Sequence, residues 1–361
     1  MKADALALAG LERTGKIPSK ETLNHPGLIR LASGLDPFAQ SAEAYREAYR
    51  SLGIDLINRA PLPGEPAPAA LQPGQVRDLG GGISEAYLGL YPTYFRTRFP
   101  FRTVEEFWEA PDLDPEYEEL ITPVPHRLER SEIEARMVFL GDTGLYYYML
   151  YTTLFMWGVE ALGMEIFLTA AALDPKGFDG KFLQRVLPKS RLLIQRLAEL
   201  DSPFVFCHDD LANAQGPIFR PSWYEEYIFP RYAELWRPAK ERGKQVIFVA
   251  DGAMGPLLEP LKATGVDGVM LENPAADFDR ILEVFGERIV IGGFETAVLT
   301  RGSPEQIRRH LRDVHARTRG MPGFVLSTPG GIHGNIPLEN LEAYFDERSR
   351  LGYTPGGWRK H

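Results

Sequence analysis

The chain has 361 residues, 44% of them hydrophobic, which is enough for a large core in one elaborated domain or in two smaller ones. Its net charge is −9 and it has no long basic run, so nucleic acid is excluded as an expected partner. The only cysteine is Cys207, so no disulfide can form within the chain, which suits a reducing compartment.

The beginning of the chain predicts a soluble protein. Residues 1–16 read as a short helix and not as a signal peptide, because Asp4 and Glu12 interrupt the apolar stretch. No apolar run approaches the length of a transmembrane helix. We therefore expect a cytoplasmic protein that does not interact with membranes.

The first 130 residues predict an N-terminal extension and the first elements of the fold. Residues 54–58, IDLIN, are the expected first strand. Residues 60–82 are so rich in proline and glycine that we predict a long surface loop. Residues 131–361 then form the remainder of what we expect to be one domain.

The middle of the chain is strongly apolar. Residues 137–140, MVFL, predict a short strand, and residues 145–168 are apolar nearly all round, which predicts a buried helix. Tyr147 lies in the aromatic run of that segment. It is a candidate to line a pocket for a flat ligand, and core packing is the alternative.

The last third repeats one pattern, in which an apolar run is followed by a polar or glycine cluster and then by a helix. These runs are VFCH, VIFVA, GVML, VIGGF and FVLS. Continuously apolar runs predict buried parallel strands, and repeated strand–helix units favour a barrel or a doubly wound sheet. In both folds the functional residues follow the carboxyl ends of the strands.

Several polar side chains follow those runs directly. They are His208, Asp209, Asp210, Asp251, Glu272, Glu295, Ser327 and His333. Imidazole and carboxylate groups at one end of a sheet suit acid–base catalysis or metal binding. The alternatives are that the carboxylates cap helices or pair with arginines, and that the histidines are structural. Cys207 lies inside an apolar run, which indicates a small core residue and not a nucleophile.

The order of motifs resembles the uroporphyrinogen decarboxylase superfamily. The segment CHDDLANAQGPIFRPSWYEEYIFPRYAEL is similar to its "DD-L…Q-G-P" segment. IGGFETAVLTRGSPEQIRRHL and GGIHGNIPLENLEAYF are similar to two later signatures of the superfamily. The resemblance implies a (β/α)8 TIM barrel, here with an N-terminal extension. It also implies either cofactor-free decarboxylation of tetrapyrroles or zinc-assisted methyl transfer between corrinoid proteins and small carriers.

The chain departs from both patterns that the resemblance implies. Val249 and Gly330 occupy positions where zinc-dependent members have ligands, so we expect the usual zinc site to be absent, and only Asp251 and Glu295 remain as metal candidates. The arginine-rich segment with which the decarboxylases bind substrate carboxylates is missing, and Arg59 is a weak substitute.

We therefore expect a methyltransferase that acts on a small methylated substrate and a corrinoid partner protein. His208, Asp210 and Glu272 would be catalytic. The expected substrate-binding residues are Asp209, Asn213, Glu295, His333 and Tyr147. Zinc remains a candidate cofactor. The alternatives are a decarboxylase-like carboxy-lyase, a non-catalytic ligand-binding barrel and an unrelated hydrolase. A homodimer is left open.

Overall fold

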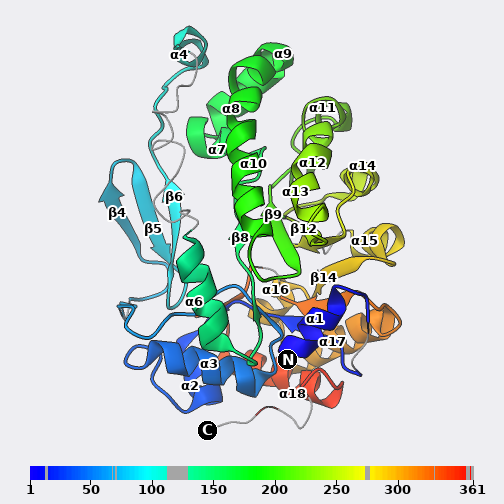
Figure 1. The fold of residues 1–361 in the computed structure, drawn as a ribbon. Coiled ribbons are helices and arrows are strands. Elements are labelled where there is room, and N and C mark those ends of the chain that lie inside the picture. Colours follow the sequence, from blue (N-terminus) through cyan, green and yellow to red (C-terminus); the bar gives the residue numbers. More distant parts are fainter. Residues whose placement is uncertain are drawn as a thin grey trace.

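The computed structural model describes residues 1–12, 15–66, 68–69, 71–111, 129–272, 277–328, 330–354 and 358. Within these residues, a parallel sheet of nine strands forms the centre of the molecule, and helices surround it (Figure 1). The sheet strands are β1 (Ser19–Lys20), β3 (Leu56–Ile57), β7 (Leu145–Tyr146), β8 (Met149–Leu150), β9 (Phe204–His208), β12 (Gln245–Ala250), β13 (Gly268–Leu271), β14 (Ile289–Gly293) and β15 (Phe324–Ser327).

Helices connect these strands and cover their outer faces. They are α1 (Lys2–Leu8), α2 (Pro26–Ser33), α3 (Ser41–Leu52), α4 (Val104–Glu109), α6 (Arg130–Leu140), α7 (Met156–Leu162), α8 (Met164–Leu173), α9 (Pro175–Phe178), η3 (Asp179–Leu183), α10 (Gln184–Ala198), α11 (Pro221–Tyr227), α12 (Phe229–Leu235), α13 (Arg237–Lys240), η4 (Gly255–Leu257), α14 (Leu258–Ala263), α15 (Phe278–Phe285), α16 (Thr296–Arg301), α17 (Pro304–Thr318) and α18 (Leu338–Arg350). None of the described helices combines the length and the apolar character needed to cross a bilayer.

Three small sheets accompany the main one. The strands β4 (Val76–Gly80), β5 (Ile83–Tyr87) and β6 (Pro92–Arg96) form an antiparallel sheet. The other two sheets pair β10 (Ala212–Asn213) with β11 (Gly216–Pro217), and β2 (Leu23–Asn24) with β16 (Ile332–His333). The connection between β5 and β6 contacts the last of these pairs, since Tyr91 N donates to Asn24 Oδ1 at 2.8 Å and Gly334 N donates to Leu88 O at 2.8 Å.

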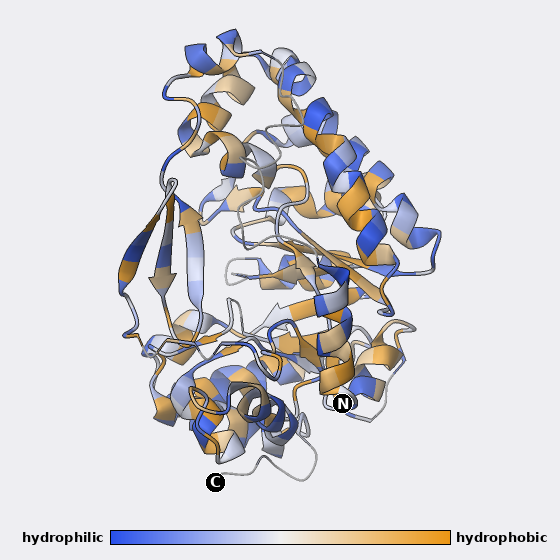
Figure 2. Ribbon diagram, turned by 60° about the vertical axis from the view of Figure 1, so that its left-hand side comes forward, coloured by the Kyte–Doolittle hydropathy of each residue, from blue (hydrophilic) through white to orange (hydrophobic). Residues whose placement is uncertain are grey.

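The predicted run of parallel strands is confirmed. The order of the main sheet is β7-β3-β1-β15-β14-β13-β12-β9-β8, and every neighbouring pair in it is parallel. The five strands expected from apolar runs are therefore consecutive neighbours. The central strands are coloured hydrophobic in Figure 2, while the helices are orange on one side and blue on the other. The sheet is curled, as in TIM-barrel-like folds, and its two end strands are separated in the chain only by Tyr147 and Tyr148.

One face of the sheet encloses an inner core. This core contains Leu56, Leu145, Tyr147, Phe204, Phe206, Ile247, Val249, Met270, Ile289, Ile291 and Val325. Ala5 and Leu8 of α1 pack into the same cluster, so α1 covers one end of it. That end is the amino end of the strands, because Lys16, just before β1, pairs with Asp55, just before β3, at 2.6 Å.

Two expectations for the first part of the chain were wrong. The first strand of the sheet is β1 and not residues 54–58, which contribute β3. Residues 76–80 are not loop but strand β4, which turns into β5 through Gly80, Gly81 and Gly82, all with positive φ. The glycines that predicted a loop therefore make the tight turn of a hairpin.

Two expectations for the middle of the chain were also wrong. Residues 137–140 end helix α6 and are not a strand. Residues 145–146 and 149–150 are strands β7 and β8, and helical structure begins only at Met156. This segment is apolar all round because the strand is buried on both sides, with Tyr146 in the outer core and Tyr147 in the inner one.

Candidate functional site

Polar side chains form a layer directly above the inner core, at the carboxyl ends of the strands. Side chains alternate along a strand, so a residue two positions after an inner-core residue faces the same side. By this alternation His208 follows Phe206, Glu272 follows Met270, and Ser327 follows Val325. Lys20 pairs in register with Ser327 and belongs to the same layer. We call the end of the sheet that carries this layer the mouth.

His208 is held as a doubly protonated imidazolium. It is 2% exposed, its Nδ1 lies 2.7 Å from the carbonyl oxygen of Tyr151, and its Nε2 lies 3.1 Å from Asp210 Oδ1. A carbonyl oxygen only accepts, so Nδ1 carries a proton, and the carboxylate favours a second proton on Nε2. Burial opposes the charge, but the bonds to Asp210 and Tyr151 outweigh it and raise the pKa of His208 to about 9. The ring also stacks on Tyr151, with centroids 4.6 Å apart.

Asp210 links the ends of two neighbouring strands. Its Oδ1 accepts the backbone N–H of Asp251 at 2.8 Å and faces His208 Nε2. Burial disfavours its charge, but the hydrogen bond and charge of His208 prevail and lower the pKa of Asp210. Asp210 is therefore an ionised carboxylate, and Asp251 lies beside it at the exposed rim.

Asp209 belongs to the scaffold and not to the surface of the mouth. Its carboxylate is fully buried and accepts four consecutive backbone N–H groups, from Thr153 to Met156, at 2.7–3.3 Å. It also accepts the hydroxyl of Tyr232 at 2.5 Å. The carboxylate thus satisfies the free N–H groups at the start of α7. This arrangement corrects the expectation that Asp209 binds substrate, because its oxygens are already occupied.

The charges of Glu272 and Lys20 attract each other at the mouth. Glu272 is half-buried, and its charge acts on Lys20, His208 and Tyr151. Lys20 is 2% exposed, and burial lowers the pKa of its ammonium, which the charges of Glu272 and Glu21 partly restore. Sequence reasoning missed Lys20, because β1 is a two-residue strand of polar residues.

His333 stands on the same side of the mouth as Lys20. Burial lowers its pKa, and the positive charges of Arg59 and Lys20 add to that effect. A Cβ atom on Gly330 would lie 3.9 Å from His333 Nε2, so the ring borders the position where the zinc-dependent members were expected to carry a ligand. We call Lys20, Arg59 and His333 the basic side of the mouth, and Asp210, Asp251 and Glu272 its acidic side.

Tyr147 is a core residue whose polar end reaches the mouth. It is 1% exposed and stacks on Phe206, with ring centroids 3.9 Å apart. Burial raises the pKa of its hydroxyl, and the charge of Glu272 adds to this. The ring is therefore packed in the core, as the alternative interpretation predicted. The charge of Glu272, a catalytic candidate, acts on the hydroxyl.

The remaining candidates lie at the edge. Asn213 is exposed, and its Oδ1 accepts the N–H of Gln215 in the hairpin of β10 and β11. Glu295 precedes α16, and its backbone N–H donates to His310 Nε2 at 3.2 Å. Cys207 is fully buried, and burial raises its pKa, which fits a core residue.

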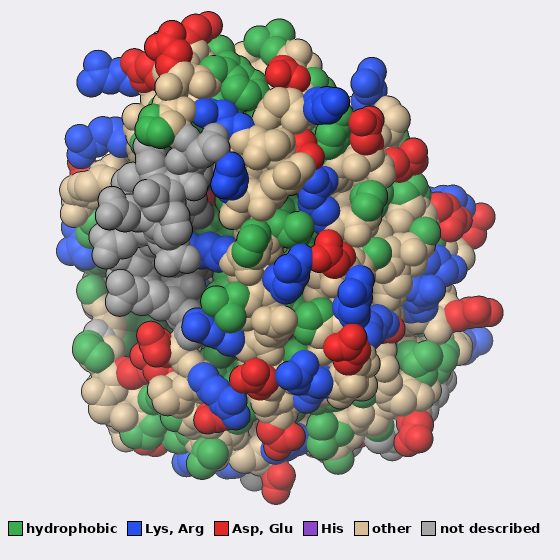
Figure 3. All heavy atoms as spheres, turned by 45° about the horizontal axis from the view of Figure 1, so that its top comes forward, with side chains coloured by type: hydrophobic (Ala, Val, Ile, Leu, Met, Phe, Trp, Pro, Cys, Tyr) green, Lys and Arg blue, Asp and Glu red, His purple; other side chains and the backbone are tan. Residues whose placement is uncertain are grey.

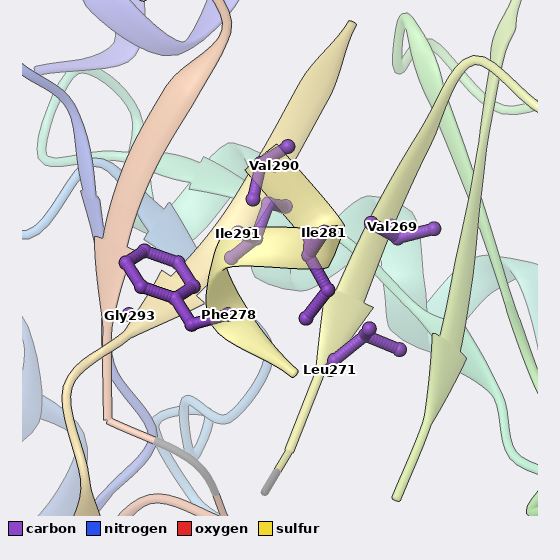
Figure 4. Close-up of a pocket in the computed structure, with 7 residues that line it drawn as sticks. All are labelled: Val269, Leu271, Phe278, Ile281, Val290, Ile291 and Gly293. Carbon is purple, nitrogen blue, oxygen red and sulfur yellow. The ribbon is translucent and has the colours of Figure 1, made fainter. Parts of the chain in front are cut away.

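An apolar gap behind the sheet is unrelated to this chemistry. It is too narrow to admit a water molecule and lies between strands β13 and β14 and helix α15, which contributes Phe278 and Ile281 (Figure 4). A Cβ on Gly293 would come within 3.2 Å of Phe278 Cζ, so the glycine lets helix and strand approach closely. Because no charged side chain lines this gap, it is a packing defect and not a reaction site. The surface seen in Figure 3 mixes Lys and Arg with Asp and Glu, without a block of one sign.

Comparison with known proteins decides the family. The family model described as uroporphyrinogen decarboxylase (URO-D) matches residues 154–351, more than half of the chain. The chain belongs to the URO-D family. It is 30% identical to the uroporphyrinogen decarboxylase of Carboxydothermus hydrogenoformans over 137 residues, which are 37% of this chain and 38% of that protein. It is 22% identical to the Pseudoalteromonas atlantica enzyme over 247 residues, 68% of each chain.

A solved structure extends the similarity to nearly the whole fold. A methyltransferase from Methanosarcina mazei superposes with a TM-score of 0.64 and 14% identity, covering 97% of this chain and 98% of that one. At this identity the match shows a shared fold. The residues before 154, which lie outside the matched family model, therefore belong to the same architecture.

The zinc site implied for the URO-D methyltransferases does not fit the residues of this chain. Val249 is buried in the inner core and Gly330 has no side chain, so neither supplies a ligand. His208 Nδ1 is taken up by Tyr151 O and its Nε2 by Asp210 Oδ1, and Asp251 Oδ1 accepts the N–H of Gly252 at 2.6 Å. Among the described residues, no three His, Cys, Asp or Glu side chains are arranged to hold a metal.

Proposed function

We propose that this URO-D family member is an enzyme that transfers a methyl group from a small methylated substrate to a corrinoid protein. The observation that carries the proposal is the ion pair of His208 and Asp210 at the mouth, beside Glu272. The similarity of fold to a methyltransferase over almost the whole of both chains supports it. The absence of the arginine-rich decarboxylase segment from the sequence argues in the same direction.

We further infer that the sheet works as a closed (β/α)8 barrel. β7 pairs with β3, and β8 pairs with β9; Tyr147, which follows β7, extends the first pairing by donating its N–H to Ile57 O at 2.9 Å. If β7 and β8 count as one interrupted strand, eight strands follow each other in a ring. The mouth then surrounds a single reaction site that a partner protein can approach from one side.

The chemistry requires a proton or a positive charge at the leaving group. When a nucleophile takes the methyl carbon, the heteroatom keeps the electron pair of the broken bond. The Nε2 proton that His208 shares with Asp210 is the one available to that heteroatom, because Tyr151 O holds the Nδ1 proton. Asp210 would keep the imidazole oriented, and Glu272 would add negative charge that maintains its protonation.

The test is methyl transfer to cob(I)alamin, followed by the change in visible absorption when the cobalt–carbon bond forms. We expect turnover with the wild type and a loss of about a hundredfold or more in His208→Ala, in line with removal of a general acid. His315→Ala serves as the matched control, because that imidazole lies on α17 and contacts the hydroxyl of Tyr353, away from the mouth. Full turnover by His208→Ala would remove the histidine from the mechanism.

Decarboxylation of a tetrapyrrole or of a smaller acid is the second candidate. Lys20 and Arg59 on the basic side of the mouth favour it, since they supply positive charge for substrate carboxylates. The two relatives described above are named uroporphyrinogen decarboxylases. Incubation with uroporphyrinogen and chromatography of the oxidised products distinguishes the two. Loss of carboxyl groups without any methyl transfer would favour the decarboxylase.

A further inference from the structure

The basic side and the acidic side of the mouth lie at the ends of different strands. Along the sheet, Arg59 follows β3 and Lys20 ends β1, and β1 lies between β3 and β15. Asp210, Asp251 and Glu272 follow β9, β12 and β13, which are consecutive neighbours elsewhere in the sheet. Apart from the His208 imidazolium, which is paired with Asp210 at the end of β9, the positive groups and the carboxylates thus occupy different strand ends. A ligand that bridges them needs an anionic group at one end.

On the basic side, Lys20 gives the clearest indication of a binding site. The side chain is 2% exposed, and among the described residues its ammonium makes no direct hydrogen bond or ion pair; the charges of Glu272 and Glu21 act on it only at longer range. The neighbouring Glu21 cannot serve, because its oxygens accept from Thr328 and Tyr344 on the outer side of the strand. A buried charge without a direct hydrogen-bond or ion-pair partner lowers the stability of the folded protein, so such groups often mark binding sites.

Two other polar atoms at the mouth are buried and lack a hydrogen bond within the described part of the protein. They are the hydroxyl of Tyr147 and the Nδ1 of His333. Buried polar atoms in proteins are nearly always bonded, and the exceptions need an explanation. A ligand with acceptor oxygens explains the ammonium and the hydroxyl together, while the neutral ring of His333, whose other nitrogen bonds the backbone of Gly330, offers Nδ1 as an acceptor.

We propose that Lys20 binds the carboxylate of the substrate, so that the substrate class is small methylated carboxylic acids. The carboxylate lies against Lys20, and the hydroxyl of Tyr147 donates to one of its oxygens. The methyl-bearing heteroatom then lies toward His208 and Asp210. That the substrate carries a methyl group rests on the proposed function. The carboxylate site rests on the geometry of the basic side alone.

The test compares two probes that share a methoxy group, methoxyacetate and the neutral 2-methoxyethanol, by isothermal titration calorimetry without any cobalt compound. We expect the wild type to bind methoxyacetate at least about tenfold more tightly than 2-methoxyethanol, as a charged hydrogen bond implies. Equal affinity for the two probes, or no binding of methoxyacetate, would overturn the proposal. This comparison needs no variant and is independent of any effect on folding.

Variants then locate the site. Lys20→Met should lower the affinity for methoxyacetate by about tenfold or more and leave 2-methoxyethanol unchanged, while Lys20→Arg should keep part of it. Lys262→Met is the matched control, because that ammonium bonds Val284 O on the outer layer. Unchanged affinity in a folded Lys20→Met protein would refute the role. Binding through Lys20 without methyl transfer to cob(I)alamin would instead contradict the proposed function and leave the carboxylate site intact.

Discussion

Removing the imidazole of His208 should change how stability depends on pH. The pKa of His208 is raised from its ordinary value of 6.5 to about 9 by its bonds to Asp210 and Tyr151, which outweigh burial. A group whose pKa is raised on folding stabilises the native state fully below its unfolded pKa, and this contribution is lost as the pH rises through the folded pKa. The window is therefore about pH 6.5 to 9, and the contribution is about 3 kcal/mol.

The assay is urea unfolding of the wild type and of His208→Gln at pH 6, 7.5 and 9.5. The difference in the free energy of unfolding should be largest at pH 6 and should shrink by about 3 kcal/mol by pH 9.5. Other titrating groups contribute to both proteins and cancel in the difference. NMR of histidine-labelled protein gives the same pKa directly. A His208 signal that titrates near 6.5, or a difference independent of pH, would refute the doubly protonated imidazole.

Three further predictions concern the scaffold. Asp209→Ala should lower the free energy of unfolding by at least about 3 kcal/mol, because the N–H groups at the start of α7 lose their acceptor, and an unchanged urea midpoint would contradict this. Cys207 should resist a thiol reagent in the native protein and react in guanidinium chloride, since it is fully buried with a raised pKa; rapid native labelling would show an open core. Gly89→Ala should lower the melting temperature, because its Cβ would lie 1.8 Å from Asn24 O; unchanged melting would mean that the β5–β6 connection moves freely away.

Strands with long apolar runs were predictable, and the strand that carries Lys20 was not. Runs such as VIFVA are buried on both faces, and this burial is visible in the sequence. β1 consists of Ser19 and Lys20, which are buried and polar. Ser19 is satisfied by Asp55, 36 residues away, so no local pattern marks the strand. In a sequence, such polar residues look like surface residues, because the distant residues that bond to them can be recognised only once the fold is known.

The candidate site was predictable as a set of strand ends, but not residue by residue. The two aspartates after His208 look alike in the sequence, yet the alternation of side chains turns one toward the mouth and the other into the scaffold. That alternation was readable: Phe206 and His208 face inward, so Asp209 faces outward. Lys20 could not be found in this way, because its strand was not recognised.

The position of β1 has a consequence for how the protein is made. The carboxylate of Glu21 is buried beside Arg348 and accepts the hydroxyl of Tyr344, a residue 323 positions later. During synthesis the ribosome releases Glu21 long before α18 exists, so the charge stays in water and β1 lacks its neighbour β15. Contacts of such separation slow folding, and the nascent chain exposes the edge of β1 until β15 has been made. Helix α18, near the far end of the described residues, is therefore needed to complete the burial of the first strand of the sheet.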